Sequence, residues 1–292
     1  ITGNPETGEK WRVRIPLLGV TSSDADALLA ADDKEATLTA SAIPNPGFSK
    51  AADFTSSGPR TGDSALRPNI TAPGVSILSA EVGSGDLGTS LSGTSMASPH
   101  VAGVAALAVQ AHPGWSSQEI SAAVVGTADS EKISDYQPSL TGGLVDPADA
   151  VNTKVLAYGD STDVQGAVVR DPNLSFGYAE SSSTFDETRK VTLVNKGTDD
   201  VQFKAEVRPS QKSLKATVSL AQDSVTVPAG GSVDVDVRIT LPATEVPSGI
   251  ASPKSPWFYE VSGNLRFTSA DQTLNMPYLM VPRTLSNVKA AE

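Results

Sequence analysis

Apolar and polar residues alternate along the second half of the chain, most regularly over residues 201–208 and residues 232–241. Successive side chains of a β-strand point to opposite faces, so this period of two predicts strands with one apolar and one polar face. Four shorter apolar segments predict further strands: residues 190–194, 216–220, 265–268 and 278–281. Turn-forming residues separate these strands, and no long helical pattern interrupts them. Residues 157–285 are therefore predicted to form an antiparallel β-sandwich, followed by a tail over residues 286–292.

The preceding block, residues 41–156, is rich in Gly, Ser and Ala and has a helical pattern. One helix is predicted from Ser95 to Ala111, because the sequence His-Pro-Gly that follows at residues 112–114 is a strong stop signal. A second helix is predicted from Ser116 to about Thr127, since Ser116 and Glu119 have the spacing of a capping box.

Residues 1–40 contain too few elements to close a core of their own. An apolar strand is predicted over residues 11–20, a short helix over about residues 24–31, opened by Ser22 or Ser23, and a second strand over residues 36–40. The chain begins Ile-Thr-Gly, without Met, a basic region or an apolar targeting segment. We therefore expect residue 1 to be a cut in a longer chain, and residues 1–40 to be the end of a domain.

Charge and composition narrow the classes of function. The 292 residues carry a formal net charge of −11, with the acidic residues spread along the chain, which argues against nucleic acid or an anionic membrane surface as partner. There is no apolar run long enough to predict a membrane span. Cysteine is absent, which excludes a disulfide framework, a thiolate metal site and a thiol nucleophile. The absence of cysteine does not decide the compartment, but it fits an extracellular protein held together by packing alone.

The segment with the clearest chemical meaning is residues 93–103, GTSMASPHVAG. A glycine-containing turn there delivers Ser95 to the first turn of a helix, whose unpaired N–H groups can stabilise an alkoxide or a tetrahedral oxyanion. Pro99 lacks an N–H group, so the helix gives up the hydrogen bond that would end on the carbonyl of Ser95. Small residues along this helix would let it lie close against other backbone.

This segment is similar, almost residue for residue, to the nucleophile motif of the subtilisin family of serine peptidases. Residues 67–74 resemble the strand and turn that the family places upstream, with Asn69 where the family usually has Asp. Residues 53–59 resemble the preceding loop, and residues 142–146 resemble the segment that closes the catalytic domain.

The flanking segments agree with this resemblance. Residues 15–29 resemble the end of a protease-associated domain, which larger members insert between the oxyanion Asn and the nucleophile. The 157–283 block resembles the fibronectin-III-like sandwich that follows the catalytic domain in such members. The implied fold is therefore α/β: the end of a protease-associated domain (1–40), the C-terminal half of a three-layer subtilisin-like domain (41–156) and the sandwich (157–285).

The resemblance also implies a chemistry. Ser95 would be the nucleophile of a secreted serine endopeptidase that hydrolyses peptide bonds in proteins or peptides. Its backbone N–H would form half of the oxyanion hole, and the Thr94 hydroxyl would assist. The triad Asp and His and the oxyanion Asn would be supplied by the N-terminal part of the parent chain. No organic cofactor and no metal ion is implied, and the isolated chain is expected to be inactive.

Several residues also have plainer interpretations. Ser95 could simply be a helix N-cap, His100 a hydrogen-bonded structural residue, and His112 an exposed residue at a helix end. Three acidic residues, Asp53, Asp63 and Asp86, could be proposed as the triad carboxylate but are better interpreted as solvated or turn residues. Two other functions stay open: a catalytically inactive pseudoenzyme or adhesion module, and a structural half that pairs with a separate N-terminal chain.

Overall fold

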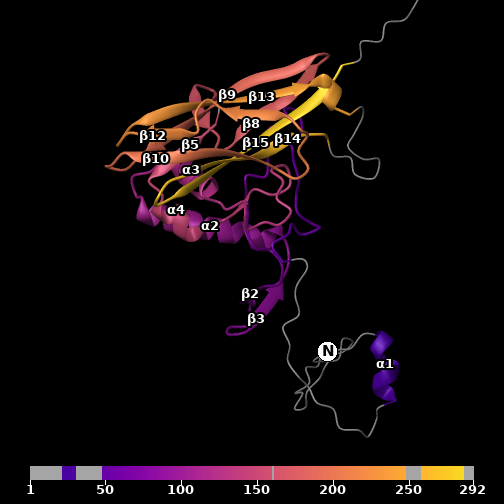
Figure 1. Ribbon diagram of the computed structural model, residues 1–292. Coiled ribbons are helices and arrows are strands. Elements are labelled where there is room, and N and C mark those ends of the chain that lie inside the picture. Colours follow the sequence, from indigo (N-terminus) through magenta and orange to yellow (C-terminus); the bar gives the residue numbers. More distant parts are fainter. Residues whose placement is uncertain (1–21, 31–47, 160, 248–257, 286–292) are drawn as a thin grey trace, which may run out of the picture. The chain divides into compact units, whose positions relative to one another are not determined.

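The computed structural model describes residues 22–30, 48–159, 161–247 and 258–285 (Figure 1). The chain divides into two compact units, residues 1–46 and residues 47–292. Helix α1 (Ser22–Leu29) is the described part of the first unit. It begins at Ser22, slightly before the predicted start at residue 24. The strands predicted over residues 11–20 and 36–40 lie outside the described residues.

The first part of the second unit, up to residue 152, holds three helices and several short strands. These elements are β1 (Ile70–Thr71), β2 (Ile77–Ala80), β3 (Gly88–Leu91), α2 (Thr94–Ala111), α3 (Ser117–Gly126), β4 (Gly143–Leu144) and α4 (Pro147–Asn152). The three helices pack around the buried side chains of Val104, Ala108, Ile120, Val124 and Ala150. Both predicted helices of this block are confirmed, and the capping box of Ser116 and Glu119 is formed.

The second part is a β-sandwich of two sheets (Figure 1). The five-stranded sheet has the order β12-β10-β14-β15-β8, and the four-stranded sheet has the order β11-β13-β9-β5. The strands of the five-stranded sheet are β8 (Leu174–Ser181), β10 (Val201–Pro209), β12 (Ser224–Val227), β14 (Val261–Thr268) and β15 (Thr273–Thr284). Those of the four-stranded sheet are β5 (Val155–Tyr158), β9 (Thr184–Asn195), β11 (Thr217–Leu220) and β13 (Ser232–Pro242). A separate hairpin, β6 (Ser161–Val164) and β7 (Ala167–Arg170), precedes β8, and a short 3-10 helix, η1 (Ala243–Glu245), follows β13.

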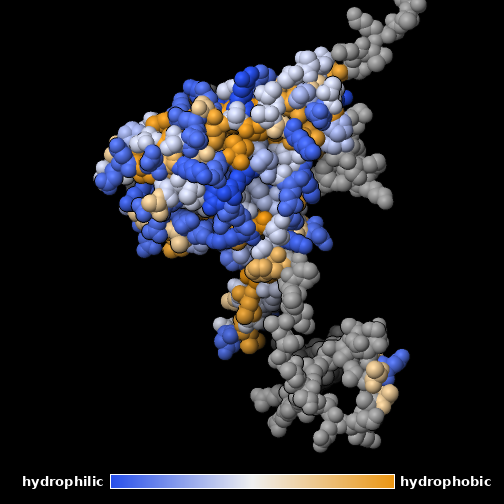
Figure 2. Space-filling model, in the orientation of Figure 1, coloured by the Kyte–Doolittle hydropathy of each residue, from blue (hydrophilic) through white to orange (hydrophobic). Residues whose placement is uncertain are grey.

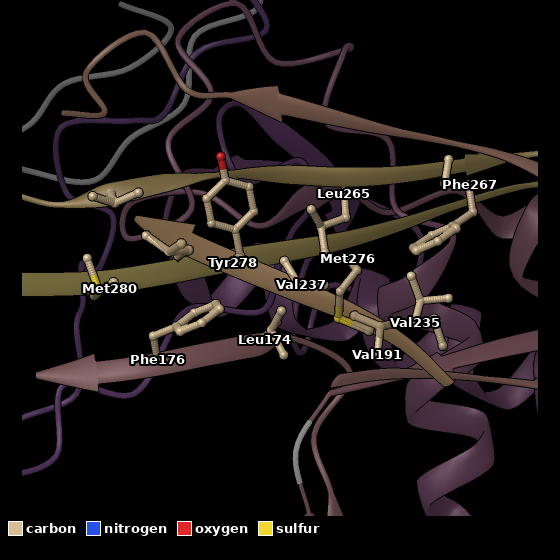
Figure 3. Close-up of a cluster of buried hydrophobic side chains, with 14 of the residues drawn as sticks. Leu174, Phe176, Val191, Val235, Val237, Leu265, Phe267, Met276, Tyr278 and Met280 are labelled. Atoms are coloured by element: carbon tan, nitrogen blue, oxygen red, sulfur yellow. The ribbon is translucent and has the colours of Figure 1, made fainter. Parts of the chain in front are cut away.

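The sequence alternation produces the core of the sandwich. In β13, Val235, Val237, Ile239 and Leu241 are buried and the residues between them face outward, as the period of two predicts. Figure 3 shows Val235 and Val237 in the same layer of side chains as Phe176, Met276 and Phe267, which come from the opposite sheet. These side chains belong to one hydrophobic cluster that fills the space between the sheets.

Two strands differ from the predicted pattern of one polar face. Nearly every residue of β14 and of the central part of β15 is buried. One face of these strands lines the sandwich core, and the other packs against the first part of the unit, where Leu66 contacts Leu279 and Val281. In addition, β15 pairs with β8 in parallel, whereas the other strand pairs of the sandwich are antiparallel among the described residues.

The two parts of the second unit also share hydrophobic packing through β5. Its residues Val155 and Ala157 lie in the sandwich core, whereas Leu156 and Tyr158 pack against Ala122 and Ala123 of α3. Within the described ranges, none of the helices combines the length and the apolar character needed to cross a membrane.

Candidate functional site

Ser95 lies in the first turn of α2 and is exposed. The helix begins at Thr94, its N-cap is Gly93, and no described side chain caps it by a hydrogen bond. Ser95 is therefore not the N-cap residue, which removes the simplest structural interpretation of this serine. Because the first N–H groups of a helix have no partner inside the helix, the hydroxyl of Ser95 lies beside backbone donors suited to a developing negative charge.

The turn that leads into α2 is fixed by close backbone contact. The N–H of Gly93 donates a 2.8 Å hydrogen bond to the carbonyl of Gly74, and the N–H of Met96 donates to the carbonyl of Gly93. A Cβ atom on Gly74 would lie 2.9 Å from the carbonyl oxygen of Gly93 and 3.3 Å from the Cβ of Ala97. Only glycine permits this approach, so residue 74 sets the position of the turn that carries Ser95.

His100 is held by its own helix. Its Nδ1 lies 2.8 Å from the carbonyl oxygen of Met96, and since a carbonyl only accepts, Nδ1 carries the hydrogen. The predicted hydrogen bond of His100 is thus confirmed. Pro99 lies inside the same helix and has no N–H to donate to the carbonyl of Ser95.

His112 differs from its prediction, because it is partly buried rather than exposed. Its Nε2 lies 2.8 Å from the carbonyl oxygen of Val151, which it reaches as a donor. The imidazole also stacks on the ring of Trp115 with the ring centroids 3.8 Å apart. The sequence showed a helix-ending turn at this point, but not the α4 carbonyl that the turn brings into reach.

The three carboxylates considered as triad alternatives are exposed and lie in turns or bends, as predicted: Asp53, Asp63 and Asp86. Asp63 forms an ion pair with Arg60 and accepts a hydrogen bond from the N–H of Ala65. The hydrogen bond from Arg60 is the main cause that holds the pKa of Asp63 far below its ordinary value. Asp63 is thus engaged within its own turn.

Exposed apolar side chains lie on the hairpin before α2 and on α2 itself. The hairpin of β2 and β3, which leads directly into the turn of Ser95, exposes Leu78, Val82, Leu87 and Leu91. Figure 2 shows this apolar surface on the projecting hairpin. On α2 itself, Val104 and Ala108 are buried, whereas Leu107 and Val109 are about half exposed, at 48% and 51%. Isolated exposed apolar residues, such as Leu107 and Val109, are ordinary, but a group like the one on the hairpin marks a contact surface.

Polar contacts that the sequence analysis did not foresee connect the sandwich with the first part of the unit. The side-chain amide of Asn275 donates to the carbonyl of Ala128 at 3.0 Å, and that of Asn264 donates to the hydroxyl of Ser130 at 2.9 Å. Glu131 forms ion pairs with both Arg208 and Arg266. The available signal was weak: polar residues at alternate positions of otherwise apolar strands.

The fold and the position of Ser95 define the class of protein: an α/β part presents a serine at a helix N-terminus, and a β-sandwich follows it. Comparison with known families then gives the family. The subtilase family model matches residues 18–166, about half of the chain, and an Fn3-like domain model matches residues 181–279. The chain belongs to the subtilase family and carries an Fn3-like domain after its subtilase part. The family resemblance and the fold class inferred from the sequence are thereby confirmed.

Individual relatives also point to the subtilase family. The chain is 30% identical over 288 residues to Subtilisin-like protease SBT4.8 of Arabidopsis thaliana, covering 75% of this chain and 39% of that protein. It is 29% identical to Subtilisin-like protease SBT4.12 of the same plant, covering 88% of this chain and 43% of the relative. Over 88 residues, 29% of this chain and 11% of the relative, it is 39% identical to Minor extracellular protease Vpr of Bacillus subtilis. The chain thus spans about two fifths of the length of these plant relatives.

Proposed function

We propose that this chain is the C-terminal portion of a secreted subtilisin-like serine endopeptidase, with Ser95 as its nucleophile. One observation carries the proposal: Ser95 is exposed in the N-terminal turn of α2, inside the segment 93–103 that resembles the family's nucleophile motif. Membership of the subtilase family supports a peptidase. The proposed substrates are proteins or peptides.

The proposed reaction is acyl transfer to water. The Oγ of Ser95 attacks the carbonyl carbon of the scissile peptide bond while a histidine from the N-terminal part of the protein takes the hydroxyl proton. The backbone N–H of Ser95 and an asparagine from the same N-terminal part hold the tetrahedral oxyanion. The histidine then protonates the leaving amine, an acyl-enzyme forms at Ser95, and water hydrolyses it to release the acid product.

The N-terminal part of the parent chain is the partner that this proposal requires. The chain spans 39% and 43% of two plant relatives, which leaves room for such a part. The exposed apolar residues of the β2–β3 hairpin and of α2 offer a surface for it to cover. Secretion is supported by the likeness to a protease whose own name describes it as extracellular.

The proposed domain boundaries remain those drawn from the sequence. The end of a protease-associated domain is proposed for residues 1–40, the subtilase part for 41–156, the Fn3-like sandwich for 157–285 and a tail for 286–292. Strand β5 (Val155–Tyr158) crosses the second boundary, because it pairs with β9 of the sandwich while two of its side chains pack on α3.

The test is labelling of the full-length peptidase with a fluorophosphonate, which reacts with an activated serine and needs no known substrate. We expect the parent protein to be labelled and Ser95→Ala to abolish both labelling and casein hydrolysis. Ser98→Ala is the matched control, since Ser98 is another exposed serine of the same helix and should label as the parent does. A Ser95→Ala protein that still labels and cleaves casein would place the nucleophile elsewhere. A parent protein that never labels would favour the pseudoenzyme.

A further inference from the structure

The five-stranded sheet has a second buried face that carries polar residues. In β14, Leu265 and Phe267 point into the sandwich core, so the alternating residues Asn264 and Arg266 point away from it. In β15 the same alternation turns Asn275 away from the core. Asn264 and Asn275 are nevertheless 2% and 6% exposed, because the first part of the unit covers this face. Buried amides at such positions need defined partners.

Their partners lie in one short segment, residues 128–131. The Nδ2 of Asn275 donates to the carbonyl of Ala128 at 3.0 Å, and the Nδ2 of Asn264 donates to Ser130 at 2.9 Å. The two amides are also joined to each other, since Asn264 donates to the Oδ1 of Asn275 at 2.8 Å. Arg266 adds an ion pair to Glu131. The sandwich thus holds this segment at three of its four residues, Ala128, Ser130 and Glu131.

Residues 128–131 in turn hold the strand pair that leads toward Ser95. Asp129 and Leu144 exchange two backbone hydrogen bonds, of 2.8 and 2.9 Å. A Cβ atom on Gly143 would lie 2.5 Å from the carbonyl oxygen of Ala128, so the two backbones are in direct contact. Strand β4, which contains Gly143, pairs in parallel with β1.

The last steps reach the nucleophile turn. Strand β1 ends at Thr71, and three residues later the carbonyl of Gly74 accepts the hydrogen bond from Gly93. Gly93 is the N-cap of α2, two residues before Ser95. Every step from Ala128 to this turn is a backbone hydrogen bond, a short covalent connection or a close contact at glycine. Such contacts leave little room to absorb a displacement between the sandwich and α2.

We propose that Asn275 of the sandwich is a positioning residue for Ser95. By binding the carbonyl of Ala128, it fixes the backbone of residues 128–131 and, through β4 and β1, the turn at Gly93. The inference rests on the proposed function, because it assigns the role with respect to Ser95 as nucleophile. Replacing the amide by an apolar group of similar size leaves the Ala128 carbonyl without this donor, and the segment moves to find another. A small shift of a nucleophile lowers the rate of the chemical step.

The first experiment measures hydrogen exchange of single amides and needs no activity. In Asn275→Leu we expect the Gly93 amide to exchange about tenfold faster, while amides of β9 and β13 keep their rates. Asn275→Asp is the second variant, since it keeps the shape and the acceptor for Asn264 but removes the donor to Ala128. Gln272→Met is the matched control: Gln272 also binds backbone through its amide, but its partner, the N–H of Lys154, lies just before β5 and outside residues 128–131. The control should leave Gly93 unchanged.

The second experiment compares kcat and KM of the full-length peptidase carrying the same substitutions. We expect both Asn275 variants to lower kcat about tenfold with KM within about twofold, and Gln272→Met to change neither. Unchanged exchange at Gly93 in both Asn275 variants, or an equal effect of the control, overturns the positioning role. That result would leave Ser95 as nucleophile untouched, because fluorophosphonate labelling tests the proposed function separately.

Discussion

At the scale of single residues, Gly143 and Gly103 differ in the space that each leaves for an added Cβ atom. An added Cβ on Gly143 meets the carbonyl of Ala128 at 2.5 Å, whereas around Gly103, apart from its own helix, no described atom lies within 4 Å of that position. Gly143→Ala is therefore expected to lower the free energy of unfolding by about 2 kcal/mol. Gly103→Ala should raise it by about 0.5–1 kcal/mol, because alanine loses less backbone freedom in a helix.

Urea denaturation of residues 1–292 measures both changes. Equal effects of the two substitutions would contradict the close approach of residues 128 and 143. Gly103→Ala is informative a second time in the full-length protein. There the same substitution should become destabilising if the other backbone against which the small residues of α2 are predicted to lie is supplied by the N-terminal part.

At this scale, the sequence predicted the hydrogen bonds that form between residues close to each other in the chain. The capping box of Ser116 and Glu119 and the hydrogen bond of His100 were predicted, and the structure confirms both, since each forms within one helical turn. The partners of His112 and Asn275 lie 39 and 147 residues away. No spacing in the sequence encodes such contacts, and a polar residue in an apolar strand indicates only that some partner exists.

At the scale of elements, α3 is tied to the sandwich through one carboxylate. Glu119 accepts hydrogen bonds from Ser116 with one oxygen and from Lys196 of the sandwich with the other, at 2.6 Å. The hydrogen bond from Lys196 is the largest cause that lowers the pKa of Glu119 in the folded protein. A lowered folded-state pKa means stability that is present above the unfolded pKa, near 4.3, and lost as the pH falls through the folded value.

Lys196→Met is therefore expected to lower the free energy of unfolding at pH 7 by less than about 1 kcal/mol. Between about pH 5 and pH 3 its stability should also fall less steeply than that of the parent protein, because the pKa of Glu119 moves back toward its unfolded value. Thermal unfolding across this pH range measures both effects. Lys212→Met, at an exposed loop lysine, is the control. A variant with the unchanged pH profile would show that the ion pair contributes nothing.

The sequence pattern predicted a strand fully only where one face of that strand is exposed to solvent. The predictions for β10 and β13 match the structure because their polar residues face solvent and mark the period. In β14 and β15 the second face is covered by the first part of the unit, so the run 278–281 reads as uniformly apolar and gives only a fragment of a strand of 12 residues. The parallel partner β8 was missed for a related reason, since pairing order is a long-range property.

At the scale of the whole molecule, the first prediction concerns the sandwich as a folding unit. Residues 153–285 expressed alone are expected to fold, because both core faces and all strands of the two sheets are included. Residues 159–285 should be less stable by about 2 kcal/mol or more, since they lack Val155 and Ala157, which are buried in the core. Circular dichroism with thermal unfolding compares the fragments. The absence of a cooperative transition in residues 153–285 would contradict an autonomous sandwich.

The last prediction concerns the chain by itself. Residues 1–292 should give no fluorophosphonate labelling above that of their own Ser95→Ala variant, because an unassisted serine hydroxyl is a weak nucleophile near neutral pH. His100 cannot take the role through Nδ1, which is bound to the carbonyl of Met96, and His112 is bound to Val151 and stacked on Trp115. The proposed general base and half of the oxyanion hole come from the N-terminal part. Labelling should appear when that part of the parent protein is supplied, joined to the chain or refolded with it. Labelling of Ser95 in residues 1–292 alone would mean that the chain contains its own general base, and the proposed division of the active site would be wrong.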